Sequence, residues 1–466
     1  MADTRFESDS MGRVEIAAGA YWGAQTQRAL RNFGVSERKI PPALIHALGT
    51  IKAAAAEVNR RLNLLEAKPA AAILQAAEEV AGGRWNDQFP VDVFQTGSGT
   101  SWNMNANEVI ANRANEILGR PLGSKSPVHP NDHVNRCQSS NDVIPTAIQI
   151  ANRISAEALM EALQGLKEAL TERAAAFRDV IKIGRTHLQD AVPMTLGQCF
   201  SGYAAQIAKA GLRIKHCLDS LEELSLGGTA LGTGINSDPA FGKRAVARIA
   251  ERSGYPFRQA ANLFEATSAR DAQAELMGAL SAAAGSLRKI ADDLRLLSSG
   301  PRAGLGEIIL PALQPGSSIM PGKVNPVIPE MVTQAAVYVQ GKAGTVAAAA
   351  SASPLELNIM LPLIAQETQE SLELLTNVCH AFRERCITGI RADEERCAHY
   401  VEWSLALITP LAAKIGYDRA AELAYRALRE KKTVRSVLEE SKLLTPEEIK
   451  TLLDPRGMIG PTAEGE

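Results

Sequence analysis

The chain of 466 residues has no closely spaced cysteine pair, no strong excess of either charge and no long apolar run. Its six cysteines are scattered without a CxxC pair, which favours reduced thiols in the cytoplasm over a disulfide framework or a zinc knuckle. Lys and Arg number 50 and Asp and Glu 52, so we expect no nucleic-acid partner and only local anion binding. No apolar run approaches the ~20 residues that cross a bilayer, and the polar start is unlike a signal peptide; we expect no membrane partner.

Apolar residues recur at helical spacing along most of the chain. The pattern begins around Pro42, and from Ala151 onward it indicates a set of long helices. Four leucines step by four, three and four, which lines one helix face: Leu159, Leu163, Leu166 and Leu170. Two comparable runs cover Ile207–Leu221 and Leu276–Leu294. Another begins near Met331, and a last one extends from about Pro354 to Cys379.

Long helices with short Gly, Pro and Ser breaks predict an elongated bundle. The segment 347–353 is almost all alanine and serine, and a thin bundle cannot cover so much apolar surface, so we expect packing against copies of the chain. A monomer with a conventional core is the alternative. After Arg391 the expected helices are shorter, and Thr445-Pro446 has the residues of a helix start. We place domains at 1–137, 138–393 and 394–466.

Two breaks between the expected helices are rich in glycine. In the break at 96–105, Gly97 and Gly99 free backbone N–H groups to face a ligand, while hydroxyls from Ser98 and Thr100 add donors. No GKS or GKT ending follows, so this is not a P-loop, and an ordinary capped loop fits the same residues. The break at 227–236 fits close packing against a helix or a ligand equally well.

The break at 128–142 has more polar residues than a turn needs. His129 and His133 have a metal-binding spacing, but Pro130 interrupts a continuous helix and no HExxH motif appears. We therefore expect no metal, and the absence of a dinucleotide fingerprint leads us to expect no cofactor. The break ends in uncharged groups suited to a carboxylate: Ser139, Ser140 and Asn141.

Two further breaks carry a histidine and a lysine. His187 stands beside Thr186 in the break at 184–190, where a core residue and a catalyst are equally good interpretations. The break at 300–326 is dense in glycine and proline, which indicates a functional lid; a merely flexible loop fits poorly with an apolar Ile-Met inside it. Four of its residues could surround an anion, with the lysine as counter-charge: Ser317, Ser318, Lys323 and Asn325.

These groups suit a small dicarboxylate and proton transfer. Removing a proton next to a carboxylate creates a dianion, which Lys323, Asn325 and backbone N–H groups could stabilise. The base must be strong when formed yet shielded from water. A serine alkoxide within a mobile cationic loop fits that need, although a serine hydroxyl is normally a very weak acid.

The segment Gly316-Ser-Ser-Ile-Met-Pro-Gly-Lys-Val-Asn325 resembles the signature of the fumarase/aspartase superfamily. The other four breaks match that family in the same order, over nearly the whole chain. The resemblance implies an all-α subunit of three domains, whose central five-helix bundles assemble into a twenty-helix homotetramer. Active sites would form where three subunits meet.

The resemblance also implies residue roles. Ser317 would take the C3 proton, and His187, oriented by Glu330, would act through a water on the C2 oxygen side. Other matching positions would bind the substrate: Ser98, Gly99, Thr100, Ser139, Ser140, Asn141, Thr186, Ser318, Lys323, Val324 and Asn325. A second dicarboxylate site outside the active site would comprise His129, Pro130, Asn131 and Asp132.

Three features resemble class II fumarases, which hydrate fumarate to L-malate in the tricarboxylic acid cycle: the sequence at 129–132, the double serine at 139–140, and Gly322 where aspartases usually carry alanine. The segments at 188–194 and 327–330 look more like aspartase, which forms fumarate and ammonia from L-aspartate.

We expect the hydration of fumarate, with aspartase activity and a non-catalytic structural protein of the superfamily as alternatives. The presence of Ser317, His187 and Lys323 together argues against the last. Lys125 and Ser126 stand where fumarases often have an arginine, which puts the affinity of the second site in question.

Overall fold

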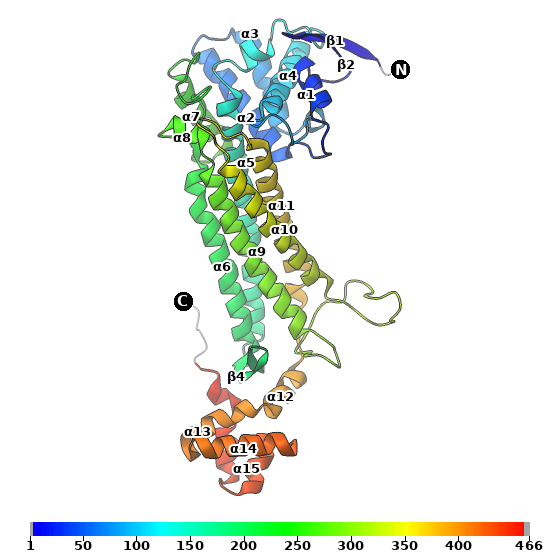
Figure 1. Cartoon of the computed structure of the whole chain (residues 1–466), viewed down its shortest axis with the longest axis vertical. Coiled ribbons are helices and arrows are strands. Elements are labelled where there is room, and N and C mark those ends of the chain that lie inside the picture. The colour runs from blue at the N-terminus through cyan, green and yellow to red at the C-terminus, as the bar shows by residue number, and fades with distance from the viewer. Residues whose placement is uncertain (1–2, 461–466) are drawn as a thin grey trace. The chain divides into compact units, whose positions relative to one another are not determined.

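The computed structural model describes residues 3–460, which are mostly helical and include four two-stranded sheets (Figure 1). Contacts divide the chain into two compact units. The first unit contains the chain up to Met160, Leu212–Ala282 and Tyr338–Leu375, and the second contains Glu161–Gly211, Ala283–Val337 and the chain from Thr376 onward. The predicted domain boundaries near 137 and 393 divide the chain differently and remain a prediction.

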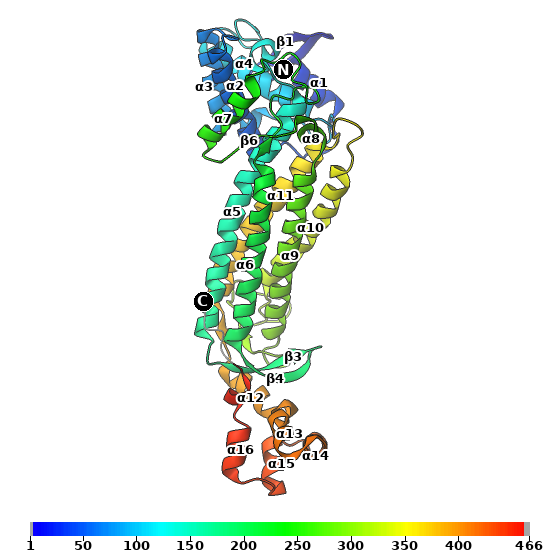
Figure 2. The same cartoon turned by 90° about the vertical axis from the view of Figure 1, so that its left-hand side faces the viewer.

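Five long helices confirm the predicted bundle, and in each unit their segments lie side by side (Figures 1 and 2). The leucines at 159, 163, 166 and 170 are all buried on one helix, as their spacing predicted. The first of these helices already begins at Ser140, earlier than the periodicity indicated. The five are α5 (Ser140–Ala176), α6 (Leu196–Leu221), α9 (Asp271–Leu297), α10 (Val327–Ala350) and α11 (Leu361–Arg385).

The prediction of a helix from Pro354 is wrong, because α11 begins only at Leu361. The Asn358 side chain is buried and donates hydrogen bonds to the backbone oxygens of Ala349 at 2.9 Å and Ala350 at 3.2 Å. These carbonyls lie at the end of α10, where the helix itself leaves them without partners. The segment before α11 therefore caps one helix instead of starting the next.

The first unit also contains an N-terminal hairpin and shorter helices. Helix α2 begins at Pro42, as predicted, and buries alanines against α3. The elements before it were not predicted. The elements of this unit are β1 (Thr4–Asp9), β2 (Gly12–Ala17), α1 (Ala24–Asn32), α2 (Pro42–Arg61), α3 (Ala67–Ala81), α4 (Thr100–Ile117), β5 (Glu223–Leu224), α7 (Phe241–Ser253), β6 (Arg258–Gln259) and α8 (Leu263–Ser268).

The second unit contains a hairpin between α5 and α6 and a group of short C-terminal helices. Thr445 caps the last of these helices in a capping box with Glu448, and Pro446 follows it, as the sequence predicted. The elements are β3 (Ile181–Thr186), β4 (Gln189–Thr195), β7 (Ile308–Ile309), β8 (Arg391–Ala392), α12 (Glu394–Trp403), α13 (Thr409–Ile415), α14 (Tyr417–Glu430), α15 (Val434–Ser441) and α16 (Pro446–Leu452).

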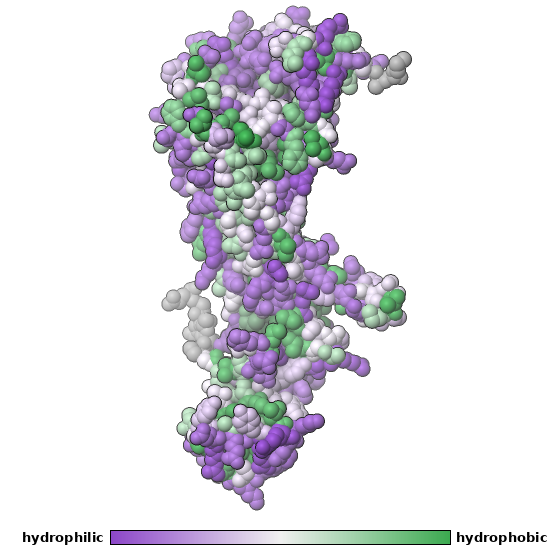
Figure 3. All heavy atoms as spheres, viewed as in Figure 1, coloured by the Kyte–Doolittle hydropathy of each residue, from purple (hydrophilic) through white to green (hydrophobic). Residues whose placement is uncertain are grey.

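The long break between α9 and α10 is irregular, as predicted. It protrudes from the bundle in Figure 1, and hydrophobic atoms lie at its tip in Figure 3. Ile319 is 83% exposed and Met320 48%. Within residues 3–460, no helix is long and apolar enough to cross a bilayer.

Candidate active site

Three hydroxyl groups of the first unit form a connected chain at the starts of two helices. The Ser98 and Thr100 hydroxyls are 2.8 Å apart, and the Thr100 and Ser140 hydroxyls are 2.9 Å apart. Thr100 is the first residue of α4 and Ser140 the first residue of α5. Two helix N-termini, each with unpaired N–H groups and a partial positive charge, therefore meet at these side chains. This arrangement suits a carboxylate.

Glycines make the loop before α4 possible. A Cβ on Gly97 would lie 2.1 Å from the backbone oxygen of Ile359, so only glycine allows this close approach. Gly99, the residue before α4, has a φ of +70°, in the left-handed region that glycine adopts without strain. Gly97 thus has a packing role, which positions Ser98 and Thr100. That the glycines free backbone N–H groups to face a ligand stays a prediction.

The turn before α5 is held by its own side chains. The Ser139 hydroxyl accepts a hydrogen bond from the backbone N–H of Asn141 at 3.2 Å. The Asn141 side chain donates to the backbone oxygen of Ala230 at 2.7 Å. The break at 227–236, whose sequence fitted packing against a helix or a ligand equally well, therefore lies against the turn that carries Ser139 to Asn141.

Two buried charged residues next to this turn were not singled out from the sequence. The carboxylate of Asp142 accepts backbone N–H groups from Ser139, Gly227 and Thr229 at 2.9 to 3.0 Å. Burial raises the pKa of Asp142 to about 6, against the lowering by these hydrogen bonds and by Lys52. Burial also lowers the pKa of Lys52 to about 7. The sequence offered one signal for Lys52: it is a lysine directly before four consecutive alanines in an expected helix.

The predicted second dicarboxylate site forms a short helical turn at Pro130–Val134. Nδ1 of His129 accepts the backbone N–H groups of Asn131 at 3.3 Å and Asp132 at 3.2 Å. The same nitrogen lies 3.2 Å from an Asp132 carboxylate oxygen, a contact that would need a proton on Nδ1. Burial lowers the pKa of His129, which favours the neutral ring that accepts these N–H groups. His129 thus occupies two N–H groups that could otherwise face an anion.

In the second unit, the break at 184–190 is a tight hairpin turn between β3 and β4. Thr186 pairs with Gln189, so His187 and Leu188 are the two turn residues. Their φ angles are +55° and +61°, although neither is glycine. A turn with both φ angles positive matches the right-handed twist of a hairpin, and strain of this kind is concentrated at functional sites. His187 therefore projects from a fixed point, and both turn residues are exposed.

A buried carboxylate anchors this hairpin. Glu307 accepts a hydrogen bond from Arg185 at 2.9 Å and lies 3.2 Å from the Lys182 ammonium as an ion pair. The Lys182 contact with Glu307 lacks hydrogen-bond geometry, and the ammonium donates to the Ile183 backbone oxygen at 2.7 Å. Glu307 is fully buried. Its role was not predicted from the sequence.

The loop with the predicted base closes at its neck. The backbone N–H of Gly316 donates to the Lys323 oxygen at 2.8 Å, and the Asn325 side chain donates to the Gly316 oxygen at 2.6 Å. At the tip, the Ser317 hydroxyl accepts the N–H groups of Ile319 at 3.3 Å and Met320 at 3.0 Å. Two donors therefore already face the oxygen that would become an alkoxide.

The predicted site residues fall in both units. Ser98, Gly99, Thr100 and Ser139 to Asn141 belong to the first unit, where hydrogen bonds join the hydroxyls. The residues at 186–187, 317–325 and Glu330 belong to the second. Within the part of the chain that the structure describes, no hydrogen bond joins His187 to Glu330, which lies in the first turn of α10. The predicted orientation of His187 by Glu330 stays a prediction.

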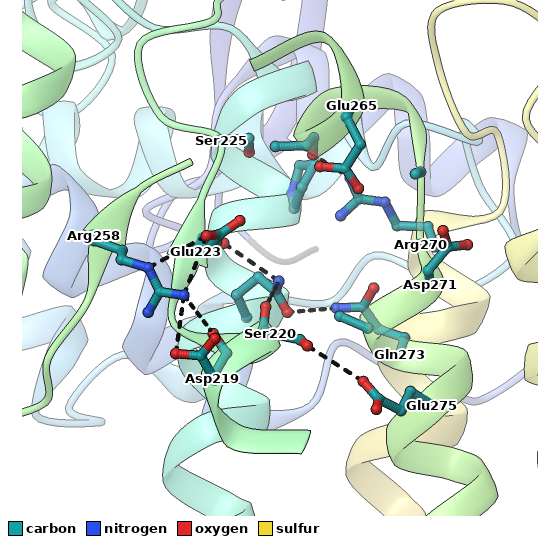
Figure 4. Close-up of a pocket in the computed structure, with 15 residues that line it drawn as sticks. Asp219, Ser220, Glu223, Ser225, Arg258, Glu265, Arg270, Asp271, Gln273 and Glu275 are labelled. Carbon is teal, nitrogen blue, oxygen red and sulfur yellow. Dashed lines mark hydrogen bonds and ion pairs between the residues drawn. The ribbon is translucent and has the colours of Figure 1, made fainter. Parts of the chain in front are cut away.

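A separate pocket of the first unit, with a volume of about 390 Å³, is lined by none of the predicted site residues (Figure 4). Arg258 contributes one cation, which is paired with Asp219 and Glu223. The guanidinium of Arg270 is the other. Carboxylates outnumber these cations around the pocket, so a dicarboxylate would be repelled: Asp219, Glu223, Glu265, Asp271 and Glu275.

Comparison with known proteins decides the family. A family model described as a lyase matches residues 12–341, and a second, described as the fumarase C C-terminus, matches residues 407–460. A class II fumarate hydratase of Thermosynechococcus vestitus is 50% identical over 98% of this chain and 98% of its own length. The chain belongs to the class II fumarate hydratase family. The resemblance read from the five breaks is thereby confirmed.

Solved structures of this lyase family have the same fold. A class II fumarase from Schistosoma mansoni superimposes with a TM-score of 0.94 at 39% identity, covering 98% of this chain and all of that one. A structure titled fumarate lyase:delta crystallin from Brucella melitensis, bound to cobalt, gives a TM-score of 0.95 at 47% identity over the same shares. As a class II fumarate hydratase family member, the chain is a lyase.

Proposed function

We propose that this chain catalyses the reversible hydration of fumarate to L-malate, a step of the tricarboxylic acid cycle. The observation that carries the proposal is the chain of hydroxyls Ser98, Thr100 and Ser140 at the N-termini of α4 and α5. It offers uncharged donors and two positive helix ends to one carboxylate. Class II fumarate hydratases at 48% to 50% identity over nearly the full chain support the same reaction.

In the malate-to-fumarate direction, Ser317 in its alkoxide form takes the proton from C3 and becomes a hydroxyl, and the C2–O bond breaks. The N–H groups of Ile319 and Met320 stabilise the Ser317 oxygen when it carries negative charge. Lys323 and Asn325 stabilise the dianion that forms when the proton leaves C3. His187, oriented by Glu330, acts through a water and protonates the departing hydroxyl, which leaves as water.

Substrate contacts are assigned to the remaining residues of both units. We keep the predicted second dicarboxylate site at His129, Pro130, Asn131 and Asp132. The residues proposed to bind the substrate are Ser98, Gly99, Thr100, Ser139, Ser140, Asn141, Thr186, Ser318, Lys323, Val324 and Asn325.

The proposed active protein is a homotetramer whose sites are shared by three subunits. A single chain leaves His187 and Lys323 exposed, whereas a serine base needs shielding from water. Apolar neighbours are exposed too: Leu188 is 73% exposed and Ile319 83%. Copies of the chain would cover these groups. We assign the protein to the cytoplasm, a placement supported by its six free cysteines.

The reaction is tested by giving the purified protein L-malate and, separately, L-aspartate, and following the ultraviolet absorbance of fumarate. Absorbance that rises with L-malate alone supports hydration, and a rise with L-aspartate alone replaces it with ammonia elimination. Sedimentation of the active protein tests the assembly. A fully active monomer would contradict the shared sites.

A further inference from the structure

The turn Ser139–Asn141 is attached to the rest of the first unit through the charged residue that follows it. One oxygen of Asp142 accepts the backbone N–H of Ser139 at 2.9 Å. The other accepts the N–H groups of Gly227 at 3.0 Å and Thr229 at 2.9 Å. The carboxylate thus joins two segments that meet only by folding, and it does so through the backbone, whose geometry cannot relax by a side-chain rotation.

A second buried charge holds the other side of the same turn. The ammonium of Lys52, on α2, donates to Asn135 at 3.0 Å and to Gln138 at 2.9 Å. Asn135 in turn donates to the backbone oxygen of Gln138 at 3.1 Å, directly before Ser139. Among the described residues, the acid that acts electrostatically on this ammonium is Asp142.

Burying these two charges is costly, and an apolar side chain of similar length would pack in the place of Lys52 without that cost. Both side chains are fully buried, so neither contributes to solubility. The groups that face the Asp142 carboxylate are Lys52 from α2, the N–H of Ser139, and the two N–H groups of the loop after β5. Of these groups, the N–H of Ser139 belongs to the turn itself, and the Asp142 carboxylate connects it to the loop after β5.

We propose that Asp142 and Lys52 are positioning residues, which together hold the turn Ser139–Asn141 in the geometry that binds a substrate carboxylate; the inference rests on the proposed function. Neither side chain touches the substrate. Asp142 fixes the turn to the loop at Gly227–Thr229. Lys52 fixes residues 135–138 and supplies the positive charge that favours the ionised form of Asp142.

The first test replaces Lys52 by methionine and measures KM and kcat for L-malate and fumarate between pH 5.5 and 8.5. We expect KM to rise about tenfold at pH 7, the loss of one or two hydrogen bonds' worth of binding, with kcat changed less than about threefold. The pKa of Asp142, about 6 in the unaltered protein, rises when the cation is removed. Protonation of Asp142 weakens its hold on the turn, so KM rises as the pH falls through this pKa. In Lys52→Met this rise of KM therefore begins at a higher pH.

Lys342→Met is the matched control, because Lys342 is a buried lysine of the same unit that pairs with Glu367 and Glu370 instead. Its loss removes a buried cation without touching the turn, so KM and its pH profile remain those of the unaltered protein. The conservative variant Lys52→Arg keeps the charge and is expected to keep KM within about threefold. A merely structural role for Lys52 predicts equal kinetic effects in both Met variants.

Asp142→Asn is the second route, and it decides the matter if Lys52→Met does not fold. The amide places an NH₂ group against N–H donors on one side of the turn, so KM rises about tenfold and no longer responds to titration at this position. KM values within twofold of the control in the folded variants overturn the inference, as does a fall in kcat with KM unchanged. If the unaltered protein turns over neither L-malate nor fumarate, the proposed function fails first, and calorimetric binding of succinate then replaces KM as the readout.

Discussion

The buried carboxylate of Glu307 makes a quantitative prediction about the hairpin that carries His187. Glu307→Gln keeps the size of the side chain but removes the negative charge between two cations. Arg185 then loses a charged acceptor at 2.9 Å, and Lys182 loses an ion-pair partner at 3.2 Å. Both cations belong to β3, and their side chains are only 14% and 5% exposed.

The size of the effect follows from that burial. Removing one partner of a buried ion pair costs about 3–5 kcal/mol, because the remaining charge stays in a poorly solvated place. Lys182 retains its bond to the Ile183 oxygen, and Arg185 stacks on the Tyr400 ring, with a centroid distance of 5.4 Å. We therefore expect the lower end of that range: Glu307→Gln should lower the free energy of local opening of β3 and β4 by about 3 kcal/mol. The equilibrium constant for opening then rises roughly a hundredfold.

Hydrogen exchange measured by mass spectrometry tests this locally, which avoids an oligomer's concentration-dependent global unfolding. Peptides from 181–195 should exchange roughly a hundredfold faster in Glu307→Gln, while peptides from α2 and α3 stay unchanged. Glu384→Gln is the control: this carboxylate of α11 also pairs with an arginine, but is 58% exposed, so its loss changes stability by about 0.5 kcal/mol or less. Hairpin exchange within threefold of the unaltered protein refutes the anchoring role.

Three further variants test other parts of the molecule. Ser317→Ala is expected to lower turnover of L-malate at least about a hundredfold while sedimentation shows an unchanged assembly, because it removes only the proposed base; unchanged activity rejects the assignment. Gly97→Ala places a Cβ 2.1 Å from the Ile359 oxygen, so the loop must shift, and we expect KM to rise about tenfold; an unaltered KM shows that the loop does not set binding. Thr445→Ala removes the cap of α16 and should destabilise that helix by about 1 kcal/mol, seen as faster exchange in 446–452 only.

The sequence predicted the helices well where periodicity was long and regular. Leu159 to Leu170 are buried on α5 as their spacing required. The segment after Pro354 misled, because its role depends on one asparagine side chain that reaches the last carbonyls of α10. Helical periodicity carries no information on which side chain caps a neighbouring helix.

The site was only partly predictable for a related reason. The hydroxyls at 98–100 and 139–141 stood out because they are dense and polar. Hydrogen bonds join all three breaks of this region, at 96–105, 128–142 and 227–236. The hairpin turn at His187-Leu188 was missed, because a turn with two positive φ angles is normally predicted from a sequence such as Asn-Gly. Lys52, Asp142 and Glu307 were missed because most of their partners are distant in sequence, and helical periodicity does not indicate such contacts.

The neck of the loop at 316–325 has a consequence for the order of events in catalysis. Because Gly316 is hydrogen-bonded to both Lys323 and Asn325, the two ends of the loop 316–325 are held together at its neck. A Cβ on Gly316 would lie 2.6 Å from the Asn325 nitrogen, so no other residue fits at the junction. Any displacement of this loop moves Ser317 and Lys323 together. The proposed base and the proposed counter-charge thus arrive and depart as one, so a substrate would meet neither without the other.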